Sequence, residues 1–292
     1  MTEAVVREAH AKVNVFLRVL GRRDDGFHDV ETLVVPTSLH DVVTVRHADR
    51  LSVHTTGPLA RAVPTDATNL ALQAARELAA DRSIGGDRAL GATIEIEKRI
   101  PVAAGLGGGS ADAAAALLAL SDLWGLGADR DALARVAIRV GSDVPALLLG
   151  EPACVRGRGE VVEPVLVQPT SWVLKPFDAA VSAADAYAWW DESGAPTGPD
   201  PGALIAAAES GADDLLGSAL FNDLQPPVAA RHPEVTAAAE AFLAAGALGA
   251  VMTGSGPTVA GLCSFAAAPS IAAAIDGAVL VDAPPSPSLL GG

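Results

Sequence analysis

A glycine-rich segment carries the strongest chemical signal in the chain. Residues 101–111 read PVAAGLGGGSA, with four glycines among the five positions 105–109. Glycine allows positive φ and close approach of the backbone, so successive N–H groups can converge on an anion. A helix that follows adds its free N–H groups and the positive end of its dipole. The segment favours a di- or triphosphate site, with a purely structural turn into a packed helix as the alternative.

Two familiar phosphate loops fit this segment less well. A P-loop ends in Gly-Lys-Ser/Thr, and the chain contains no Gly-Lys pair. A dinucleotide fingerprint needs G-x-G-x-x-G/A inside a βαβ unit, whereas here Ser110 occupies the last position. The region before the glycines also lacks an alternating strand–helix rhythm. A Rossmann-type oxidoreductase is therefore disfavoured.

Asp143 and Lys12 are the charged residues whose surroundings suggest chemistry. Asp143 lies in the sequence GSDVP at 141–145, where Pro145 biases Val144 towards an extended conformation. The acid is therefore expected in a rigid, non-helical segment, although an exposed turn is the commoner place for such an aspartate. Lys12 and Asn14 should share one face of a strand, because side chains alternate along a strand. A lysine at a strand start is usually a surface residue.

The apolar periodicity predicts strands and helices that alternate irregularly. In the first half we expect strands over 12–20, 27–35, 41–47 and 92–96, and helices over 69–80, 111–123 (with Ser110 as N-cap) and 131–140. In the second half we expect strands over 172–174, 250–253 and 258–263, and helices over 183–190, 203–209 and 233–245. Without a strict βαβ rhythm the fold class is α+β. A boundary near residue 165 gives domains 1–165 and 166–292.

Composition excludes several partners. The formal net charge of -15 argues against nucleic acid and against an anionic membrane. Cys154 and Cys263 lack CxxC spacing, so neither a disulfide scaffold nor a zinc site is expected, and a reducing cytoplasm fits. The first residues show no apolar signal-peptide core. The uncharged run 241–275 is interrupted at 253–257 and 269–270, which leaves pieces too short to span a membrane.

The motifs occur together, in an order that resembles the GHMP kinases. The three motifs of that family are similar to residues 11–14 (AKVN), 101–111 and 252–256 (MTGSG). Further segments resemble the branch whose acceptor is a methylerythritol linked to cytidine diphosphate: RRDDGFH at 22–28, TNL at 68–70, GSDVP at 141–145 and NDL at 222–224. The resemblance extends to about residue 263. It implies a two-domain GHMP kinase fold with the active site in the cleft between the domains.

The resemblance also implies roles for individual residues. Asp143 would be the catalytic base and Lys12 its cationic partner, while Asn14, Phe27 and His28 would hold the small-molecule substrate. Phe27 would stack on the cytosine and His28 would hydrogen-bond it. Mg²⁺ should accompany ATP, with Ser110 and Asp112 as candidate ligands. ATP would lie along one continuous segment, with Asn69 and Lys98 near the nucleoside; the segment consists of Pro101, Val102, Ala103, Ala104, Gly105, Leu106, Gly107, Gly108, Gly109, Ser110 and Ala111.

Two other functions remain open within this resemblance. A homoserine or mevalonate-type kinase of the same family would have no base to stack on residues 26–28, which argues against it. A non-catalytic ATP-binding sensor could keep the glycine loop and lose the acid or the lysine. Both Asp143 and Lys12 are present, which favours an enzyme.

Overall fold

Two β-sheets organise the computed structural model, which describes residues 4–86 and 88–284. Within these residues the larger sheet has seven strands in the order β3-β4-β2-β1-β8, with β5 paired to β2 and β6 to β5. Its strands are β1 (Ala4–Arg22), β2 (His28–His47), β3 (Ser52–Thr56), β4 (Ala92–Glu97), β5 (Ala153–Gly157), β6 (Val161–Pro164) and β8 (Phe221–Asn222). The smaller sheet, in the order β11-β7-β10-β9, contains β7 (Thr170–Lys175), β9 (Gly249–Met252), β10 (Val259–Cys263) and β11 (Val279–Ala283).

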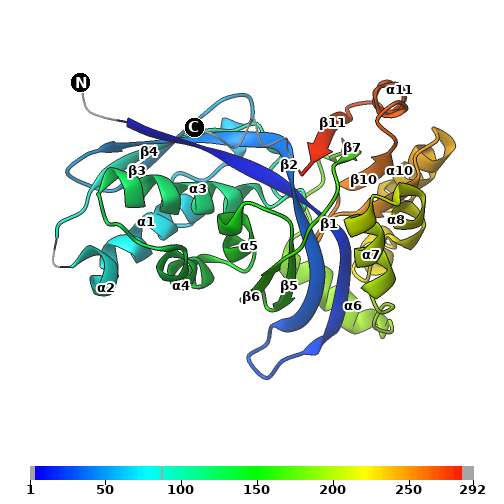
Figure 1. Cartoon of the computed structure of the whole chain (residues 1–292), viewed down its shortest axis with the longest axis horizontal. Coiled ribbons are helices and arrows are strands. Elements are labelled where there is room, and N and C mark those ends of the chain that lie inside the picture. Colours follow the sequence, from blue (N-terminus) through cyan, green and yellow to red (C-terminus); the bar gives the residue numbers. More distant parts are fainter. Residues whose placement is uncertain (1–3, 87, 285–292) are drawn as a thin grey trace.

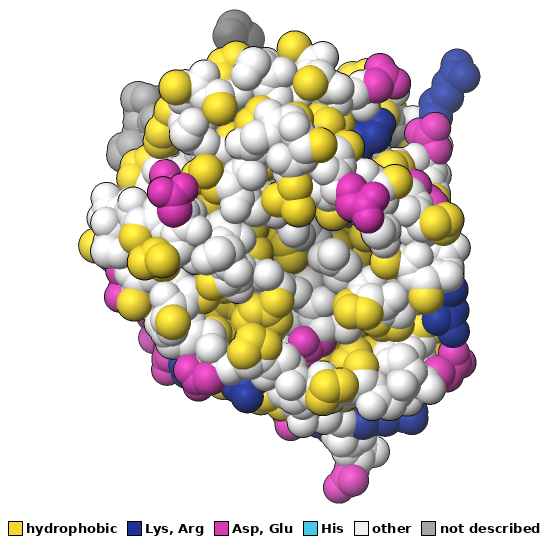
Figure 2. All heavy atoms as spheres, turned by 90° about the vertical axis from the view of Figure 1, so that its right-hand side faces the viewer, with side chains coloured by type: hydrophobic (Ala, Val, Ile, Leu, Met, Phe, Trp, Pro, Cys, Tyr) yellow, Lys and Arg dark blue, Asp and Glu magenta, His cyan; other side chains and the backbone are white. Residues whose placement is uncertain are grey.

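The helices fall into two groups on either side of the long β1–β2 pair (Figure 1). With the larger sheet lie α1 (Leu70–Ala80), α2 (Arg82–Gly85), α3 (Gly108–Leu123), α4 (Arg130–Val140) and α5 (Val144–Leu149), together with a 3-10 turn at Ala60–Ala62. With the smaller sheet lie α6 (Ala183–Ser193), α7 (Gly202–Ser210), α8 (Asp213–Ala219), α9 (Gln225–Ala229), α10 (Pro233–Ala244) and α11 (Ala268–Ala274). The face formed by this second group carries scattered apolar side chains, and its charged side chains lie mostly towards the rim (Figure 2).

Helix α3 is the centre of the first group. It packs against β1 and β2 on one side and against α1, α4 and α5 on the others. Ala113, Ala116, Leu117 and Leu120 are all 0% exposed, so the helix has almost no polar face. Small alanine side chains let its neighbours approach closely, and this packing fixes where its glycine-rich N-terminus lies.

Strand β2 corrects one sequence prediction. The strands expected over 27–35 and 41–47 are one continuous strand, because β1 pairs with β2 on both sides of Pro36 through a register shift between His10 and Lys12. On its other side β2 pairs with β5 at 30–34 and with β4 at 42–47. Pro36 lies between these two stretches, where its missing N–H costs no ladder hydrogen bond.

Two helix starts also differ from the sequence prediction. Val144 and Pro145 begin helix α5 rather than an extended segment, because proline is tolerated in the first turn of a helix. Helix α3 begins at Gly108 with Gly107 as its left-handed N-cap, so Ser110 lies inside the first turn and is not the cap. The glycine run supplies the positive φ that this start requires.

Strand β1 begins at Ala4, well before the expected start at residue 12. Most other expected elements are confirmed to within a few residues, and the α+β class is confirmed. The two sheets fall on either side of residue 165 except for β8, which pairs in parallel with β1 through Phe16 and Phe221. The domain boundary itself stays a prediction. Within residues 4–86 and 88–284, no helix is long and apolar enough to cross a membrane. The sequence from residue 283 onward begins APPSP and predicts a loosely ordered tail, but this segment lies almost entirely outside the described residues.

Candidate active site

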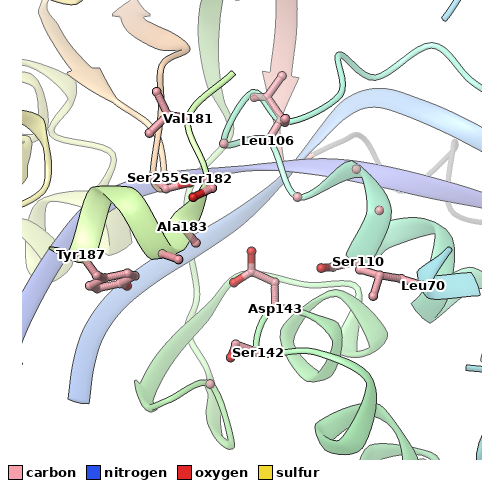
Figure 3. A pocket seen from close by; sticks show the side chains of 18 of the residues that line it. Leu70, Leu106, Ser110, Ser142, Asp143, Val181, Ser182, Ala183, Tyr187 and Ser255 are labelled. Carbon is pink, nitrogen blue, oxygen red and sulfur yellow. The ribbon is translucent and has the colours of Figure 1, made fainter. Parts of the chain in front are cut away.

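A cavity of about 1020 Å³ lies between the glycine loop, β1, α6 and the start of α5. The Asp143 side chain points into it, with Tyr187 and Ala183 of α6 on one side and Ser110 of α3 on the other (Figure 3). The cavity therefore brings together the segments that the sequence singled out, although they lie far apart along the chain.

Two glycines of the loop are required by contacts within the protein. Gly105 has φ +77, and a Cβ placed on it would lie 2.2 Å from the carbonyl oxygen of Thr253. Gly107 has φ +70, and its Cβ would lie 3.1 Å from the Lys12 side chain. The absence of side chains here lets the loop pack against Lys12 and against the turn after β9.

The other two glycines lie on opposite sides of the helix start. Gly108 is buried, and a Cβ on it would lie 2.9 Å from Lys98 Nζ and 3.0 Å from Ile100. Gly109 is exposed to the cavity, and within 4 Å its Cβ would meet only Leu70, at 3.5 Å, among the described residues. The first N–H groups of a helix have no partner inside the helix. Gly109 thus offers open backbone at the positive end of α3, which suits an anion.

Lys12 lies at the centre of the site. It is 2% exposed, and its Nζ donates to Asn14 Oδ1 and to the Gly105 carbonyl oxygen at 2.8 Å. Its Nζ lies 3.9 Å from Asp143 Oδ2. Burial lowers the Lys12 pKa, while the Asp143 charge acts to raise it. An ammonium has three N–H donors, so one is left for Asp143 or a ligand oxygen.

Asn14 and Asn69 border the cavity with their polar atoms already engaged. Asn14 shares a strand face with Lys12, as predicted, and its Nδ2 donates to Thr32 Oγ1 at 2.8 Å. Asn69 is the N-cap of α1: its Oδ1 accepts from the Ala71 N–H at 3.0 Å, and its Nδ2 donates to the Pro64 carbonyl at 2.8 Å. These bonds give both residues a structural task, and ligand contacts by either stay a prediction.

Lys98 belongs to a buried charge group that the sequence did not reveal. Its Nζ donates to Asp41 Oδ2 at 2.5 Å and to Asp112 Oδ2 at 2.8 Å. Burial raises the Asp112 pKa to about 7; Lys98 acts to lower it and Asp41 to raise it further. Asp112 Oδ1 has no hydrogen-bond partner among the described residues. Two acids share one lysine directly beneath Gly108, and the role expected for Lys98 near a nucleoside stays a prediction.

An aromatic pocket occupies the end of the cavity near α6. The Tyr187 ring stacks on the His28 ring, with centroids 4.8 Å apart and planes at 19°. His28 Nε2 lies 2.8 Å from Asp191 Oδ1. Phe27 is 47% exposed, and the Arg158 guanidinium lies 4.0 Å from its ring centroid. Burial, together with the Asp143 charge, raises the Tyr187 pKa, so this phenol stays protonated.

Sequence reasoning missed Tyr187, Asp191 and Arg158. The helix over 183–190 was expected, but which of its faces meets residues 27 and 28 depends on how the two halves of the chain pack. One signal was available: Tyr187 is the only tyrosine among 292 residues, in a chain with few aromatic residues.

The NDL segment at 222–224 and the MTGSG segment at 252–256 hold Lys12 and Asn14 in position. Asn222 Nδ2 donates to the carbonyl oxygens of Met252 at 2.7 Å and Gly254 at 2.8 Å. Thr253 Oγ1 accepts from the Asn14 backbone N–H at 2.9 Å. A Cβ on Gly254 would lie 2.7 Å from Lys12 Nζ. This turn therefore positions Lys12, and its glycine leaves room for the ammonium group.

The chemistry of these groups defines a class of protein. A helix N-terminus with open glycine backbone can hold phosphates, a carboxylate can accept a proton from an alcohol, and a buried ammonium can neutralise charge between them. Together these groups could transfer a phosphoryl group from a nucleotide to an alcohol, which is the reaction of a small-molecule kinase.

Comparison with known proteins gives the family. Residues 69–151 match the GHMP kinases N terminal domain, and residues 204–281 match the GHMP kinases C terminal domain. A 4-diphosphocytidyl-2-C-methyl-D-erythritol kinase from Symbiobacterium thermophilum is 46% identical over 87% of this chain and 89% of its own length. The enzyme of the same name from Mycolicibacterium paratuberculosis is 43% identical over 94% and 86%. The chain belongs to the GHMP kinase family.

Solved structures agree with this assignment. A crystal structure of 4-(cytidine 5'-diphospho)-2C-methyl-D-erythritol kinase superimposes with a TM-score of 0.77 at 33% identity, covering 98% of this chain and all (100%) of that one. The homoserine kinase from Cytophaga hutchinsonii has a TM-score of 0.70 at 20% identity, covering 97% and 95%, and shares the fold.

Proposed function

We propose that this chain transfers a phosphoryl group from ATP to the 2-hydroxyl of 4-diphosphocytidyl-2-C-methyl-D-erythritol, a step of the non-mevalonate route to isoprenoid precursors. The observation that carries the proposal is the aromatic pocket of Phe27, His28 and Tyr187 in the same cavity as Lys12 and Asp143. The relatives at 43–46% identity that bear the name of this kinase support it.

The aromatic pocket suits cytosine in shape and hydrogen bonding. Phe27 and Tyr187 both line the cavity, and stacking of a base on an aromatic ring is worth about 1–3 kcal/mol per base. Asp191 is an acceptor, so its 2.8 Å contact favours the His28 tautomer with the proton on Nε2. The other ring nitrogen, Nδ1, is then an acceptor. Cytosine presents an amino group to such an acceptor, whereas uracil has a carbonyl in its place.

Asp143 and Lys12 divide the work of the transfer. Phosphoryl transfer depends mainly on positioning and on neutralising charge. The partly exposed carboxylate of Asp143, 46% accessible, can take the proton of an acceptor hydroxyl within hydrogen-bond reach. The ammonium of Lys12 is fixed by Asn14 and Gly105, so it stabilises negative charge without reorganising.

ATP fits along residues 101–111 with its phosphates at Gly109 and Ser110. Mg²⁺, when bound, would shield the charge between neighbouring phosphate oxygens, and such ions keep most of their ligands as phosphates and water. Ser110 lies beside Asp143 in the cavity and fits this requirement as a ligand (Figure 3). Asp112 fits it less well because it is 3% exposed and bonded to Lys98.

The same residues argue against two alternative functions. A homoserine or mevalonate-type kinase would leave the pocket of Phe27, His28 and Tyr187 without an occupant. A non-catalytic sensor would leave the Lys12–Asp143 pair without a task.

We place the protein in the cytoplasm, consistent with Cys154 and Cys263, which are both buried and free.

A substrate panel tests the proposal directly. Purified protein with Mg·ATP is given 4-diphosphocytidyl-2-C-methyl-D-erythritol, its uridine analogue, homoserine or mevalonate, and ADP formation is followed. We expect rapid turnover with the cytidine compound alone. Preferred turnover of homoserine or mevalonate would assign another member of the family. ATP binding without turnover of any alcohol would favour the sensor.

A further inference from the structure

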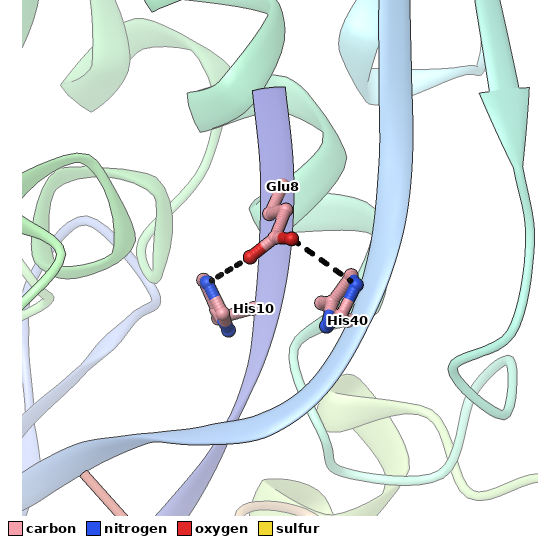
Figure 4. A group of neighbouring side chains, drawn as sticks. All are labelled: Glu8, His10 and His40. Carbon is pink, nitrogen blue, oxygen red and sulfur yellow. Dashed lines mark ion pairs between the residues drawn. The ribbon is translucent and has the colours of Figure 1, made fainter. Parts of the chain in front are cut away.

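A second cluster of ionisable side chains lies on the β1–β2 pair, outside the cavity: Glu8, His10 and His40 (Figure 4). The β1–β2 ladder places His10 opposite His40, and Glu8 precedes His10 by two residues on the same face. Glu8 Oε2 lies 3.3 Å from His10 Nε2, and Glu8 Oε1 lies 3.6 Å from His40 Nε2. One potential donor atom from each residue lies within 4.8 Å of the others.

The two imidazoles are held by the same kind of bond. His10 Nδ1 lies 2.8 Å from the Thr37 carbonyl oxygen, and His40 Nδ1 lies 2.9 Å from the Ser38 carbonyl oxygen. A carbonyl oxygen only accepts, so each Nδ1 carries a proton, and in a neutral ring Nε2 then holds a lone pair. Both Nε2 atoms face Glu8. Backbone carbonyls orient metal-ligating histidines in proteins in this way.

The hydrogen bonding of His10 points in the same direction. Its Nε2 is buried, and although Glu8 Oε2 lies 3.3 Å away, this nitrogen makes no hydrogen bond within the described part of the chain. A buried polar atom without a hydrogen bond is costly, and a bound cation would satisfy it.

We propose that Glu8, His10 and His40 bind a divalent transition-metal ion such as Zn²⁺. Zinc bonds to imidazole nitrogen and carboxylate oxygen are about 2.0–2.2 Å long, so tetrahedral ligands lie about 3.3–3.6 Å apart. The contact of Glu8 Oε2 with His10 Nε2 at 3.3 Å has that spacing, and the other carboxylate oxygen lies 3.6 Å from His40 Nε2. Imidazole with carboxylate suits zinc, copper or nickel rather than Mg²⁺ or Ca²⁺. Three protein ligands leave one position for water.

The position of this metal site indicates a structural role. None of its three residues lines the cavity, but His10 precedes Lys12 across the register shift, and His40 immediately precedes Asp41. A metal bound here would cross-link β1 and β2 at the point where their pairing slips. It would thereby hold the strand pair that positions Lys12 and Asp41.

Metal titration of the full-length protein, with any affinity tag removed and after treatment with a chelator, tests this site. Co²⁺ binding is followed by visible absorption and Zn²⁺ binding by calorimetry, both without nucleotide. We expect one ion per chain. His10→Ala, His40→Ala and Glu8→Gln should each weaken binding at least about tenfold, the scale on which even outer partners of a metal site act. The matched control is His54→Ala, an exposed histidine on β3, which should bind as the parent protein does.

Circular dichroism confirms the fold of each variant, and Glu8→Gln decides the outcome if a histidine variant misfolds. The proposal fails if the parent protein takes up no stoichiometric ion, or if the folded variants keep its affinity. A loss of metal binding in the His54→Ala control equal to that in His40→Ala would also overturn it, because the binding would then be non-specific.

Discussion

Replacing Gly109 or Gly108 by alanine should change the stability of the protein in opposite directions, because the two Cβ atoms point to different sides of α3. At Gly109 the new methyl would meet only Leu70, at 3.5 Å, among the described residues, which is ordinary contact. Replacing glycine inside a helix stabilises it by up to about 1 kcal/mol. Gly109→Ala should therefore leave the melting temperature unchanged or raise it by about 2–4 °C.

The same methyl enters the space where a phosphate would approach the backbone N–H groups. A hydrogen bond to a charged group contributes about 1.5–3 kcal/mol, and losing one corresponds to about a 10- to 150-fold loss of affinity. We expect Gly109→Ala to weaken ATP binding in that range. At Gly108 the methyl would lie 2.9 Å from Lys98 Nζ and 3.0 Å from Ile100. Overpacking of this kind costs about 1–3 kcal/mol, so Gly108→Ala should lower the melting temperature.

Calorimetry with a non-hydrolysable ATP analogue measures the affinity, and thermal unfolding without nucleotide measures the stability. The parent protein and both variants are compared in one buffer. A folded Gly109→Ala protein with unchanged nucleotide affinity would show that the helix start does not bind phosphate. The loop would then serve only to pack against Lys12 and the turn after β9.

Three further substitutions test the other groups of the site. Asp143→Asn should lower turnover at least about 100-fold with little change in ATP affinity, and near-normal turnover would remove Asp143 as the base. Phe27→Ala should weaken the cytidine substrate about 5- to 150-fold and leave ATP binding unchanged; equal losses for both would indicate misfolding instead. Asp112→Asn should make the free energy of unfolding depend less steeply on pH. The native Asp112 pKa of about 7 lies above the ordinary 3.8, so the parent protein loses stability as pH rises between these values. If the free energy of unfolding of the variant depends on pH as steeply as that of the parent, Asp112 is not the group that titrates.

Local sequence patterns predicted those parts of the site that lie within a single segment of the chain. Period-2 alternation placed Lys12 beside Asn14, and the glycine run located the start of helix α3 at the cavity. The distance from Lys12 to Asp143 could not be predicted, because two remote segments meet only through the packing of α3 and α5 on the sheet. The charge group around Lys98 joins three segments and leaves no local pattern.

The continuous strand β2 shows a different limit of sequence reasoning. Residues 36–40 (PTSLH) interrupt the apolar alternation, so the pattern indicates two strands. The backbone continues because β1 follows it through a register shift, and that shift is a property of the pair rather than of either strand. Which face of α6 meets residues 27 and 28 likewise depends on how the two halves of the chain pack, and not on the sequence of α6 alone.

The charge group beneath Gly108 couples the site to solvent protons. Lys98, Asp41 and Asp112 carry an excess negative charge when both acids are ionised, and the Asp112 pKa of about 7 means that this acid is only partly ionised near neutral pH. A nucleotide phosphate bound above the helix start would raise that pKa further. Binding should then draw a fraction of a proton from the buffer, so the measured heat of nucleotide binding would vary with the ionisation enthalpy of the buffer chosen.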